Sequence, residues 1–158
     1  MHDSLRWINS ADIAEVARSA REPDRVEWAL MDRGGTSCLE NMLEEAVTRS
    51  NVSMAAVHND NVIALFGVVL LSDVSRTGSV WALATEEVEQ STIYRRWYRI
   101  SHQLIPVLGQ SFDRLENVVH VKNTKALKFI RLLGFSVSSQ PVIVKGEEFF
   151  PFHMDFCS

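Results

Sequence analysis

Apolar residues recur every three or four positions through the first fifty residues, which is the period of an amphipathic helix. The stretch LRWI predicts a short strand, after which Ile13, Val16 and Ala17 share one face of a helix. Asn9 or Ser10 precedes them and is suited to cap that helix. Two further helices are expected in PDRVEWALMDR and SCLENMLEEAV.

Capping and turn residues mark the ends of these helices. Pro23 suits the first turn of the second helix, because an N–H would have no intrahelical partner there. Gly34 and Gly35 are expected to end that helix. Ser37 and Glu40 have the spacing of a capping box at the start of the third.

Strand patterns begin after Ser50. The segments VSMAAV and VIALFGVVLL flank the polar residues 58–61, which favours a turn between two antiparallel strands. GSVWALAT predicts a third strand. A long amphipathic helix is then expected over residues 92–112, with a kink at Pro106 or an end near Ile105, because proline lacks a backbone donor.

The last third predicts a strand at NVVHV, a helix at residues 124–133 ended by Gly134, and a hairpin turning at residues 145–148. Pro151 in this hairpin suits only an edge strand or a bulge. Four tail phenylalanines are spaced unlike a strand with one buried face, so one or two are expected to be exposed on an edge strand that suits a protein partner. They are Phe149, Phe150, Phe152 and Phe156.

This order of elements predicts a mixed α/β (α+β) fold. A chain of 158 residues, 46% of them hydrophobic, can bury a substantial core, so a single domain over residues 1–158 is expected. The apolar run VIALFGVVLL falls short of the roughly 18 to 20 residues of a membrane helix. No secretory signal peptide is apparent at the N-terminus.

Charge and cysteine spacing narrow the classes of function. The net charge of -4 argues against broad electrostatic binding to nucleic acid and leaves only YRRWYR as a local basic contact. Cys38 and Cys157 lie far apart, without CxxC or histidine spacing, so free thiols and no metal site are expected. The four tryptophans are expected to anchor the core or an interface rather than stack on bases.

The segment NTKALKFIRLLGF is similar to one that is frequent in the GNAT superfamily of acyl-CoA-dependent N-acyltransferases, and the element order matches over nearly the whole chain. The matching residues are Asn123, Ala126, Phe129, Gly134 and Phe135. This resemblance implies a mostly antiparallel central sheet of six to seven strands, helices on both faces, and a splayed pair of central strands. It also implies acetyl-CoA as acyl donor and an amine as acceptor.

A closer resemblance is to small GNAT-like proteins of short-tailed bacteriophages, including those described as internal virion protein A. The stretches that carry it are VWALAT, YRRWYR, NVVHVKNT, FIRLLGF and FPFHMDF. This resemblance implies a phage origin, a location in the host cytoplasm or the virion, and a phage or host protein as partner.

The GNAT resemblance also assigns cofactor contacts. In active members, exposed backbone groups of one splayed strand pair with the pantetheine amides, a role that falls here to Leu83, Ala84 and Thr85. Asn123 either contacts the cofactor arm or caps the helix that it precedes.

The start of the long helix is the expected anion site for the cofactor diphosphate. Ser91 or Thr92 would act as N-cap, and the helix dipole would add positive potential. Arg95 and Arg96 follow one turn later and would bind the phosphates. The alternative is that these arginines belong to a solvated helix face.

Several residues depart from the GNAT pattern. The phosphate loop usually reads Arg or Gln, two residues, Gly, one residue, and Gly or Ala. Glu89 stands at its basic position, and Thr92 and Tyr94 stand at its two small positions, which opposes the binding of a diphosphate. Ile130 stands where many members have the tyrosine that protonates the thiolate, so a proton would have to come from elsewhere, such as Tyr94 or water.

A general base is not evident from the pattern. Glu86, Glu87 and His120 lie on or just past strands that border the cleft of the family, which makes them candidates. The alternatives are solvated carboxylates at a strand end and a structural histidine with satisfied hydrogen bonds.

Three functions follow from these features. The first is an N-acyltransferase that uses acetyl-CoA. The second is a catalytically inactive GNAT fold that serves as a virion component or a host-interaction module. The third, supported only by YRRWYR, is a small nucleic-acid binder.

Overall fold

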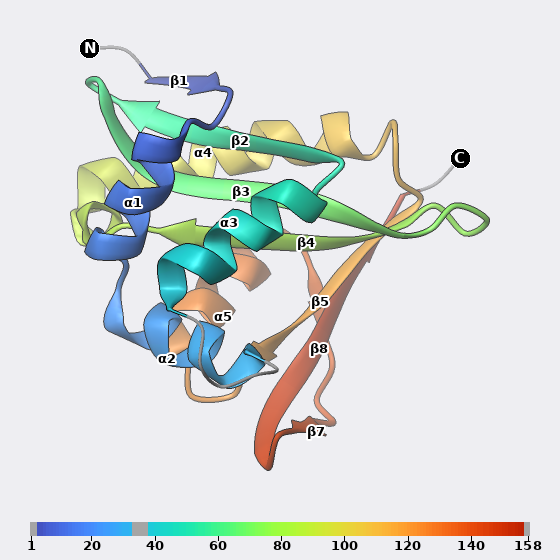
Figure 1. Cartoon of the computed structure of the whole chain (residues 1–158). Helices are drawn as coiled ribbons and strands as arrows, with labels where there is room; N and C mark the ends of the chain where they lie inside the picture. Colours follow the sequence, from blue (N-terminus) through green and yellow to red (C-terminus); the bar gives the residue numbers. More distant parts are fainter. Residues whose placement is uncertain (1–2, 33–37, 157–158) are drawn as a thin grey trace.

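The structure is a computed structural model that describes residues 3–32 and 38–156. The α-helices and the main strands follow one another along these residues in the order that the sequence predicts (Figure 1). They are β1 (Asp3–Arg6), α1 (Ser10–Ser19), α2 (Glu22–Met31), α3 (Leu39–Arg49), β2 (Val52–His58), β3 (Asn61–Ser72), β4 (Thr77–Ala84), the 3-10 helix η1 (Glu86–Glu89), α4 (Ser91–Leu108), β5 (Arg114–His120), α5 (Thr124–Leu132), β6 (Ser136–Val137), β7 (Val142–Val144) and β8 (Glu147–Asp155).

One sheet contains all of these strands, in the order β1-β2-β3-β4-β5-β8-β6 with β7 also paired to β8. Every pairing is antiparallel except that of β4 with β5. The predicted mixed, mostly antiparallel sheet is confirmed. It has eight strands among the described residues rather than six or seven, because the short β6 and β7 both pair with β8.

Helices cover both faces of the sheet, as expected. α1, α2 and α3 lie on one face, and α4 and α5 lie on the other (Figure 1). The first face buries the apolar stripes of α1 and α3 against β2, β3 and β4, around Val16, Leu43 and Leu65. On the opposite face, Trp97 of α4 packs with Phe66 of β3. The apolar side of each of these helices is therefore buried against the sheet.

Local signals in the sequence were accurate where short-range chemistry decides the conformation. The Asn9 side chain caps α1 by accepting from the Asp12 N–H at 2.9 Å, and Asp12 completes the capping box. Asn59 and Asp60 have φ of 49° and 66°, as a tight hairpin turn requires. Gly134 has φ of 99° and follows α5.

The starts and ends of other helices differ from the pattern. α3 begins at Leu39 behind Cys38, and Ser37, Gly34 and Gly35 lie outside the described residues. α4 runs through Pro106 to Leu108 instead of ending near Ile105. Pro106 is exposed, whereas Ile105 and Leu108 are buried, so packing of the last turn compensates for the missing hydrogen bond.

The C-terminal hairpin turns at Lys145 and Gly146, both with positive φ, as predicted. The expectation of an exposed aromatic edge strand is wrong, because β8 lies between β5 on one side and β6 and β7 on the other. Phe149 and Phe152 are buried, and Phe150 and Phe156 are half-buried.

Pro151 is tolerated inside β8 because its nitrogen, which carries no hydrogen, faces a gap between two neighbouring strands. Its carbonyl accepts from Ser138 N–H at 2.8 Å, which places its backbone polar side toward the break between β6 and β7. Among the described residues, β6 pairs with residues 152 and 153 and β7 with residues 147–149, so neither strand requires a donor from Pro151.

The predicted splayed pair of strands is present. β4 and β5 pair only where residues 77–79 face residues 114–116, and they then diverge (Figure 1). β3 and β4, by contrast, pair along the whole of β4, and β5 and β8 pair along the whole of β5. The sheet therefore consists of two halves that meet at the base of a fork.

Candidate active site

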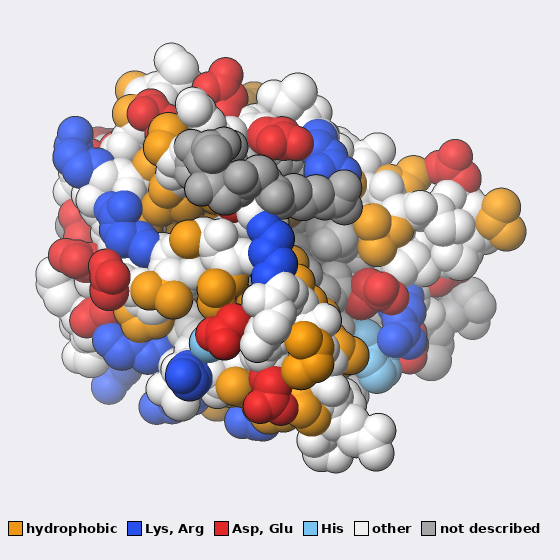
Figure 2. Space-filling model, turned by 60° about the horizontal axis from the view of Figure 1, so that its bottom comes forward, with side chains coloured by type: hydrophobic (Ala, Val, Ile, Leu, Met, Phe, Trp, Pro, Cys, Tyr) orange, Lys and Arg blue, Asp and Glu red, His pale blue; other side chains and the backbone are white. Residues whose placement is uncertain are grey.

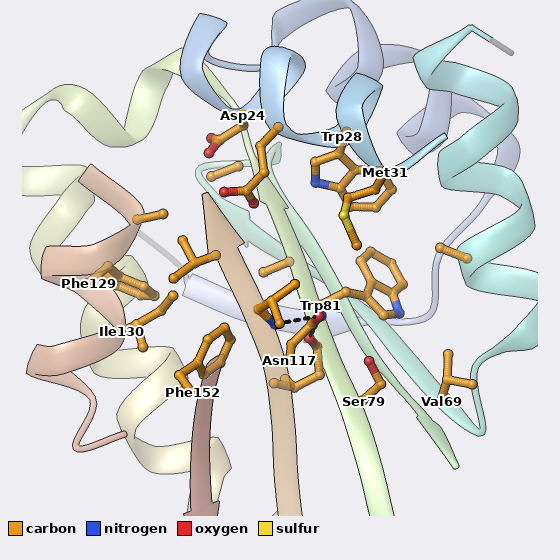
Figure 3. Close-up of a pocket in the computed structure, with 18 of the residues that line it drawn as sticks. Asp24, Trp28, Met31, Val69, Ser79, Trp81, Asn117, Phe129, Ile130 and Phe152 are labelled. Carbon is orange, nitrogen blue, oxygen red and sulfur yellow. Dashed lines mark hydrogen bonds between the residues drawn. The ribbon is translucent and has the colours of Figure 1, made fainter. Parts of the chain in front are cut away.

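A pocket of about 640 Å³ occupies the fork between β4 and β5. Figure 3 shows its walls: Trp28 and Met31 come from α2, Trp81 and Ser79 from β4, Phe129 and Ile130 from α5. The pocket thus opens between helices on both faces of the sheet.

Asn117 of β5 lies at the apex of the fork. Its amide Nδ2 donates to the carbonyl of Val80 at 2.6 Å, and its Oδ1 accepts from the N–H of Val118 at 2.8 Å (Figure 3). The side chain therefore satisfies one backbone group on each strand where the direct ladder ends. This allows the strands to separate without leaving those two groups unpaired.

Beyond the apex, the backbone of β4 directs polar groups toward the pocket, and no strand among the described residues pairs with Ala82 on that side. Thr85 donates its N–H to Ile63 of β3, so alternation directs the polar groups of Leu83 toward β3 as well. Ala82 and Ala84 then direct theirs toward the fork, where β5 has already diverged. Both alanines line the pocket.

Asn123 joins three elements at the far end of β5. Its Oδ1 accepts from Ala126 N–H at 3.2 Å and caps α5. Its Nδ2 donates to Asp24 at 3.0 Å and to Glu27 at 3.4 Å, both on α2. The side chain is 2% exposed, so these bonds fix α2 against the start of α5.

Glu27 is a carboxylate of the pocket whose pKa is strongly raised. Its Oε1 also accepts the backbone N–H of His120 at 2.8 Å. Burial raises the pKa of Glu27 to about 7, the charge of Asp24 adds to the rise, and the donors from His120 and Asn123 partly oppose it. Near neutral pH this group can therefore both hold and accept a proton.

Asp24 differs from Glu27 because it has a cationic partner. The guanidinium of Arg21 donates to Asp24 at 2.9 Å, and both side chains are about nine-tenths buried. The two carboxylates lie one helical turn apart on α2, and both line the pocket.

The architecture is similar to that of solved N-acetyltransferases. The chain aligns with a putative phosphinothricin N-acetyltransferase at a TM-score of 0.68 and 16% identity, over 99% of this chain and 100% of that one. AAC(6')-Ib in complex with ribostamycin and coenzyme A aligns at a TM-score of 0.70 and 12% identity, over 98% and 94% of the two chains. The chain has the GNAT fold.

A spermidine N-acetyltransferase from Vibrio cholerae, in complex with CoA and spermine, aligns at a TM-score of 0.62 and 15% identity, over 98% of this chain and 95% of that one. Neither a family profile nor a curated protein matches the sequence. Because these identities are so low, the likeness concerns the GNAT fold alone.

Of the strand residues that the GNAT resemblance assigned to pantetheine, Ala84 lines the pocket and Leu83 and Thr85 do not. Leu83 packs into the core beneath α1 and α3. Thr85 also forms an isolated antiparallel bridge with Ala20, on the edge that faces away from β3. The turn between α1 and α2 thus pairs with the residue that follows β4, beside the fork.

At the start of α4, the N-cap is Gln90, so the prediction that Ser91 or Thr92 caps this helix is wrong, and the expected anion site lies at the surface. Ser91, Thr92 and Arg95 are exposed, and Arg96 is half-buried. Glu89, at the position that is usually basic, receives a hydrogen bond from Lys125 Nζ at 2.8 Å, which lowers the pKa of Glu89 below its usual value. Lys125 therefore offsets the negative charge that opposes a diphosphate.

Aromatic rings fill the space between α4 and α5. Trp97 stacks on Phe129 with ring centroids 5.6 Å apart, and Tyr94 meets the same ring edge-on at 5.8 Å. The Tyr94 hydroxyl is buried without a hydrogen-bond partner among the described residues, and burial raises its pKa. Ile130, at the usual tyrosine position, lines the pocket.

The three candidate bases lie outside the pocket lining. Glu86 is exposed and Glu87 half-exposed on η1. The His120 ring is directed to β8, where it lies 3.3 Å from Glu147 and packs on Phe149. Only the backbone of His120 reaches the pocket group Glu27.

Glu27 is not singled out by the sequence pattern alone. A signal was present, because Asp24, Glu27, Trp28 and Met31 recur at the spacing of one helix face. Two carboxylates on the same face as a tryptophan are unusual for a helix that only covers a sheet.

Neither a metal-binding group nor a surface patch of one charge marks this site. Among residues 3–32 and 38–156, no group of three or more His, Cys, Asp or Glu is arranged to hold a metal ion. Figure 2 shows acidic and basic side chains interspersed on one face, without a single-sign patch. Within the same residues, no helix is long and apolar enough to cross a membrane.

Proposed function

We propose that the protein is an acyl-CoA-dependent N-acyltransferase that transfers an acyl group from acetyl-CoA to an amine. The observation that carries this proposal is the fork itself, where backbone groups of β4 and the carboxylate of Glu27 border one pocket. The solved N-acetyltransferases of the same fold support it.

The residues at the fork fit the pantetheine arm of the cofactor. Ala82 directs its backbone groups into the fork, and Ala82 and Ala84 have the smallest side chains that still form a strand wall. Leu83 and Thr85 hold these two groups in place by pairing with β3. The bridge between Ala20 and Thr85 limits this surface to the stretch before Thr85.

The diphosphate would lie at the start of α4. Ser91 and Thr92 carry the free N–H groups of the first turn, and Arg95 and Arg96 follow one turn later. Lys125 offsets the charge of Glu89 at the same place. Asn123 acts at a distance, because its amide positions the carboxylate of Glu27.

In this function acetyl-CoA supplies the acyl group as an activated thioester: the amine nitrogen forms the amide bond while the C–S bond breaks, and coenzyme A leaves as a thiolate that takes up a proton from water. Glu27 accepts the proton that an ammonium must lose before its nitrogen becomes a nucleophile. Its pKa of about 7 suits that step, since the group is partly ionised at neutral pH and its affinity for a proton is still appreciable.

Calorimetric titration with acetyl-CoA tests the donor site. We expect binding that weakens about tenfold in Arg95→Ala, because a charge-assisted contact to phosphate is lost. Arg99→Ala is the matched control, since Arg99 is also exposed on the same helix but lies one turn farther from its start. Absence of heat at millimolar acetyl-CoA would overturn the proposed function.

A catalytically inactive role is the second candidate. Glu89 at a basic loop position, Ile130 at the tyrosine position and the bridge at the end of β4 favour it. In that case the protein would be a phage virion component or would bind a host protein, in keeping with the phage resemblance of the sequence. Trp7 is 73% exposed and Val74 98% exposed, which gives two apolar contact points.

Two measurements distinguish the enzyme from the inactive fold: release of thiol from acetyl-CoA, and retention of a partner from infected-cell lysate. Acetyl-CoA binding without release of thiol in the presence of any amine would favour the inactive fold. A monomer that retains nothing from infected-cell lysate, together with amine-dependent thiol release, would favour the enzyme.

A further inference from the structure

The wall of the pocket between α2 and β4 is apolar and aromatic. Trp28 of α2 and Trp81 of β4 meet edge to face, with ring centroids 6.0 Å apart, and Met31 lies beside them (Figure 3). All three line the pocket, and none is fully buried. This wall lies on the opposite face of the sheet from α5.

Trp81 is held rigidly in this wall. Its ring lies over Gly67 of β3, where a Cβ would come within 2.8 Å of the indole. Its Nε1 donates to the hydroxyl of Ser50 at 2.7 Å. Because the polar atom of the ring already has a partner, the surface that Trp81 offers to a ligand is purely apolar.

Four carboxylates line the pocket, those of Asp24, Glu27, Asp32 and Glu45. Asp24 is paired with Arg21, and Glu45 lies at the exposed rim, 3.8 Å from Arg49. Glu27 has no cationic partner within the part of the chain that the structure describes. Its recorded hydrogen bonds all reach Oε1, which leaves Oε2 for a ligand.

We propose that this part of the pocket binds a primary amine carried on an apolar body, with the ammonium at Glu27 and the body against Trp28, Trp81 and Met31. The role of this amine as the acyl acceptor rests on the proposed function. Binding of the amine depends only on the residues that line the pocket. The carboxylate of Glu27, which lies beside aromatic rings, matches one ammonium and a hydrophobic chain. A polyamine would need several such carboxylates along its length.

Binding of three probes separates these chemistries. Hexylamine carries the charge and the chain, hexanol carries only the chain, and spermidine carries several charges. At about pH 8, above the pKa of Glu27, we expect hexylamine to bind at least about tenfold more tightly than either of the others. Calorimetry gives the affinities, and tryptophan fluorescence reports contact with Trp28 and Trp81.

Two variants locate the charge. Glu27→Gln should weaken hexylamine binding about tenfold and leave hexanol unchanged, since Gln still accepts the N–H of His120. Glu45→Gln is the matched control, because it removes a carboxylate from the rim and should leave hexylamine binding unchanged. Melting temperatures of both variants establish that each is folded.

The outcomes distinguish this inference from the proposed function. Spermidine binding as tightly as hexylamine, or no hexylamine binding at millimolar concentration with and without acetyl-CoA, overturns the inference. Hexylamine binding that depends on Glu27, in a protein that does not bind acetyl-CoA, supports the amine site and overturns acyl transfer. Acetyl-CoA binding without any amine binding supports the proposed cofactor site and overturns the amine site.

Discussion

At the scale of single residues, Glu27 shows how position changes the chemistry of a carboxylate. Three contacts act on it: the backbone of His120 in β5, the amide of Asn123 before α5, and the charge of Asp24 on its own helix. The two donors favour the ionised form, whereas burial and Asp24 favour the protonated form. Burial is the largest effect, so the pKa rises from 4.5 to about 7.

This shift predicts a pH-dependent stability. The folded state binds the proton of Glu27 more tightly than the unfolded chain, so its contribution to stability is complete below about pH 4.5 and is lost as the pH rises through about 7. Relative to Glu27→Gln, which cannot titrate, the wild type should lose on the order of 3 kcal/mol of unfolding free energy between these limits. Urea denaturation across that range measures the difference.

The control for this measurement is Glu22→Gln on the same helix, where the side chain is exposed. Its stability difference from the wild type should not change over the pH interval in which Glu27 titrates. A difference between wild type and Glu27→Gln that stays constant with pH would contradict the raised pKa. It would also remove the argument that Glu27 acts as the base.

At the scale of elements, the fork depends on the amide of Asn117. In Asn117→Ala, the carbonyl of Val80 and the N–H of Val118 lose their partner in a half-buried setting, so we expect a loss of about 1–3 kcal/mol of unfolding free energy. Asn117→Asp should lose at least as much, because it keeps an acceptor for Val118 but places a second acceptor oxygen against the carbonyl of Val80. Denaturant titration of both variants gives the values.

Asn41→Ala serves as the matched control, since Asn41 is exposed on α3 and should change stability by no more than about 0.5 kcal/mol. If Asn117→Ala is as stable as the wild type, the side chain does not maintain the separation of β4 and β5. In that event the strands would be expected to separate because of their packing against α2 and α5 alone.

Elements that local chemistry specifies were predictable from the sequence. Asn9 caps α1, residues 58–61 form a turn, and Gly134 follows α5, because each depends on neighbours within a few positions. The exposed aromatic edge was wrongly expected, since the pairing of β6 with β8 depends on the path of the whole tail. Spacing within a strand does not reveal how many partners it has.

The candidate site was only partly predictable for the same reason. The splayed strands follow from the GNAT resemblance, but Asn117 looks like an ordinary strand residue until β4 lies beside it. Glu27 and His120 are far apart in the sequence, and their contact exists only after α2 packs across the end of β5. Such a pKa cannot be inferred from a helix periodicity.

At the scale of the whole molecule, several contacts join the two half-sheets, and two of these joints border the pocket. One is the base of the fork, where residues 77–79 pair with residues 114–116. The other is α2, which belongs to the N-terminal half of the chain and is hydrogen-bonded to the end of β5 and to Asn123. The pocket lies between these two joints, so its width is set by both.

This arrangement predicts a pattern of amide hydrogen exchange in β4. The N–H of Ala82 faces the open fork, while that of Leu83 faces β3, so Ala82 should exchange at least about 100-fold faster than Leu83. If the fork holds a pantetheine arm, acetyl-CoA should slow exchange at Ala82 at least about tenfold and leave Leu83 unchanged. Nuclear magnetic resonance resolves both amides.

Slow exchange at Ala82 without ligand would mean that the half-sheets close on each other in solution. If acetyl-CoA does not change the exchange rate of Ala82, the cofactor does not lie in the fork.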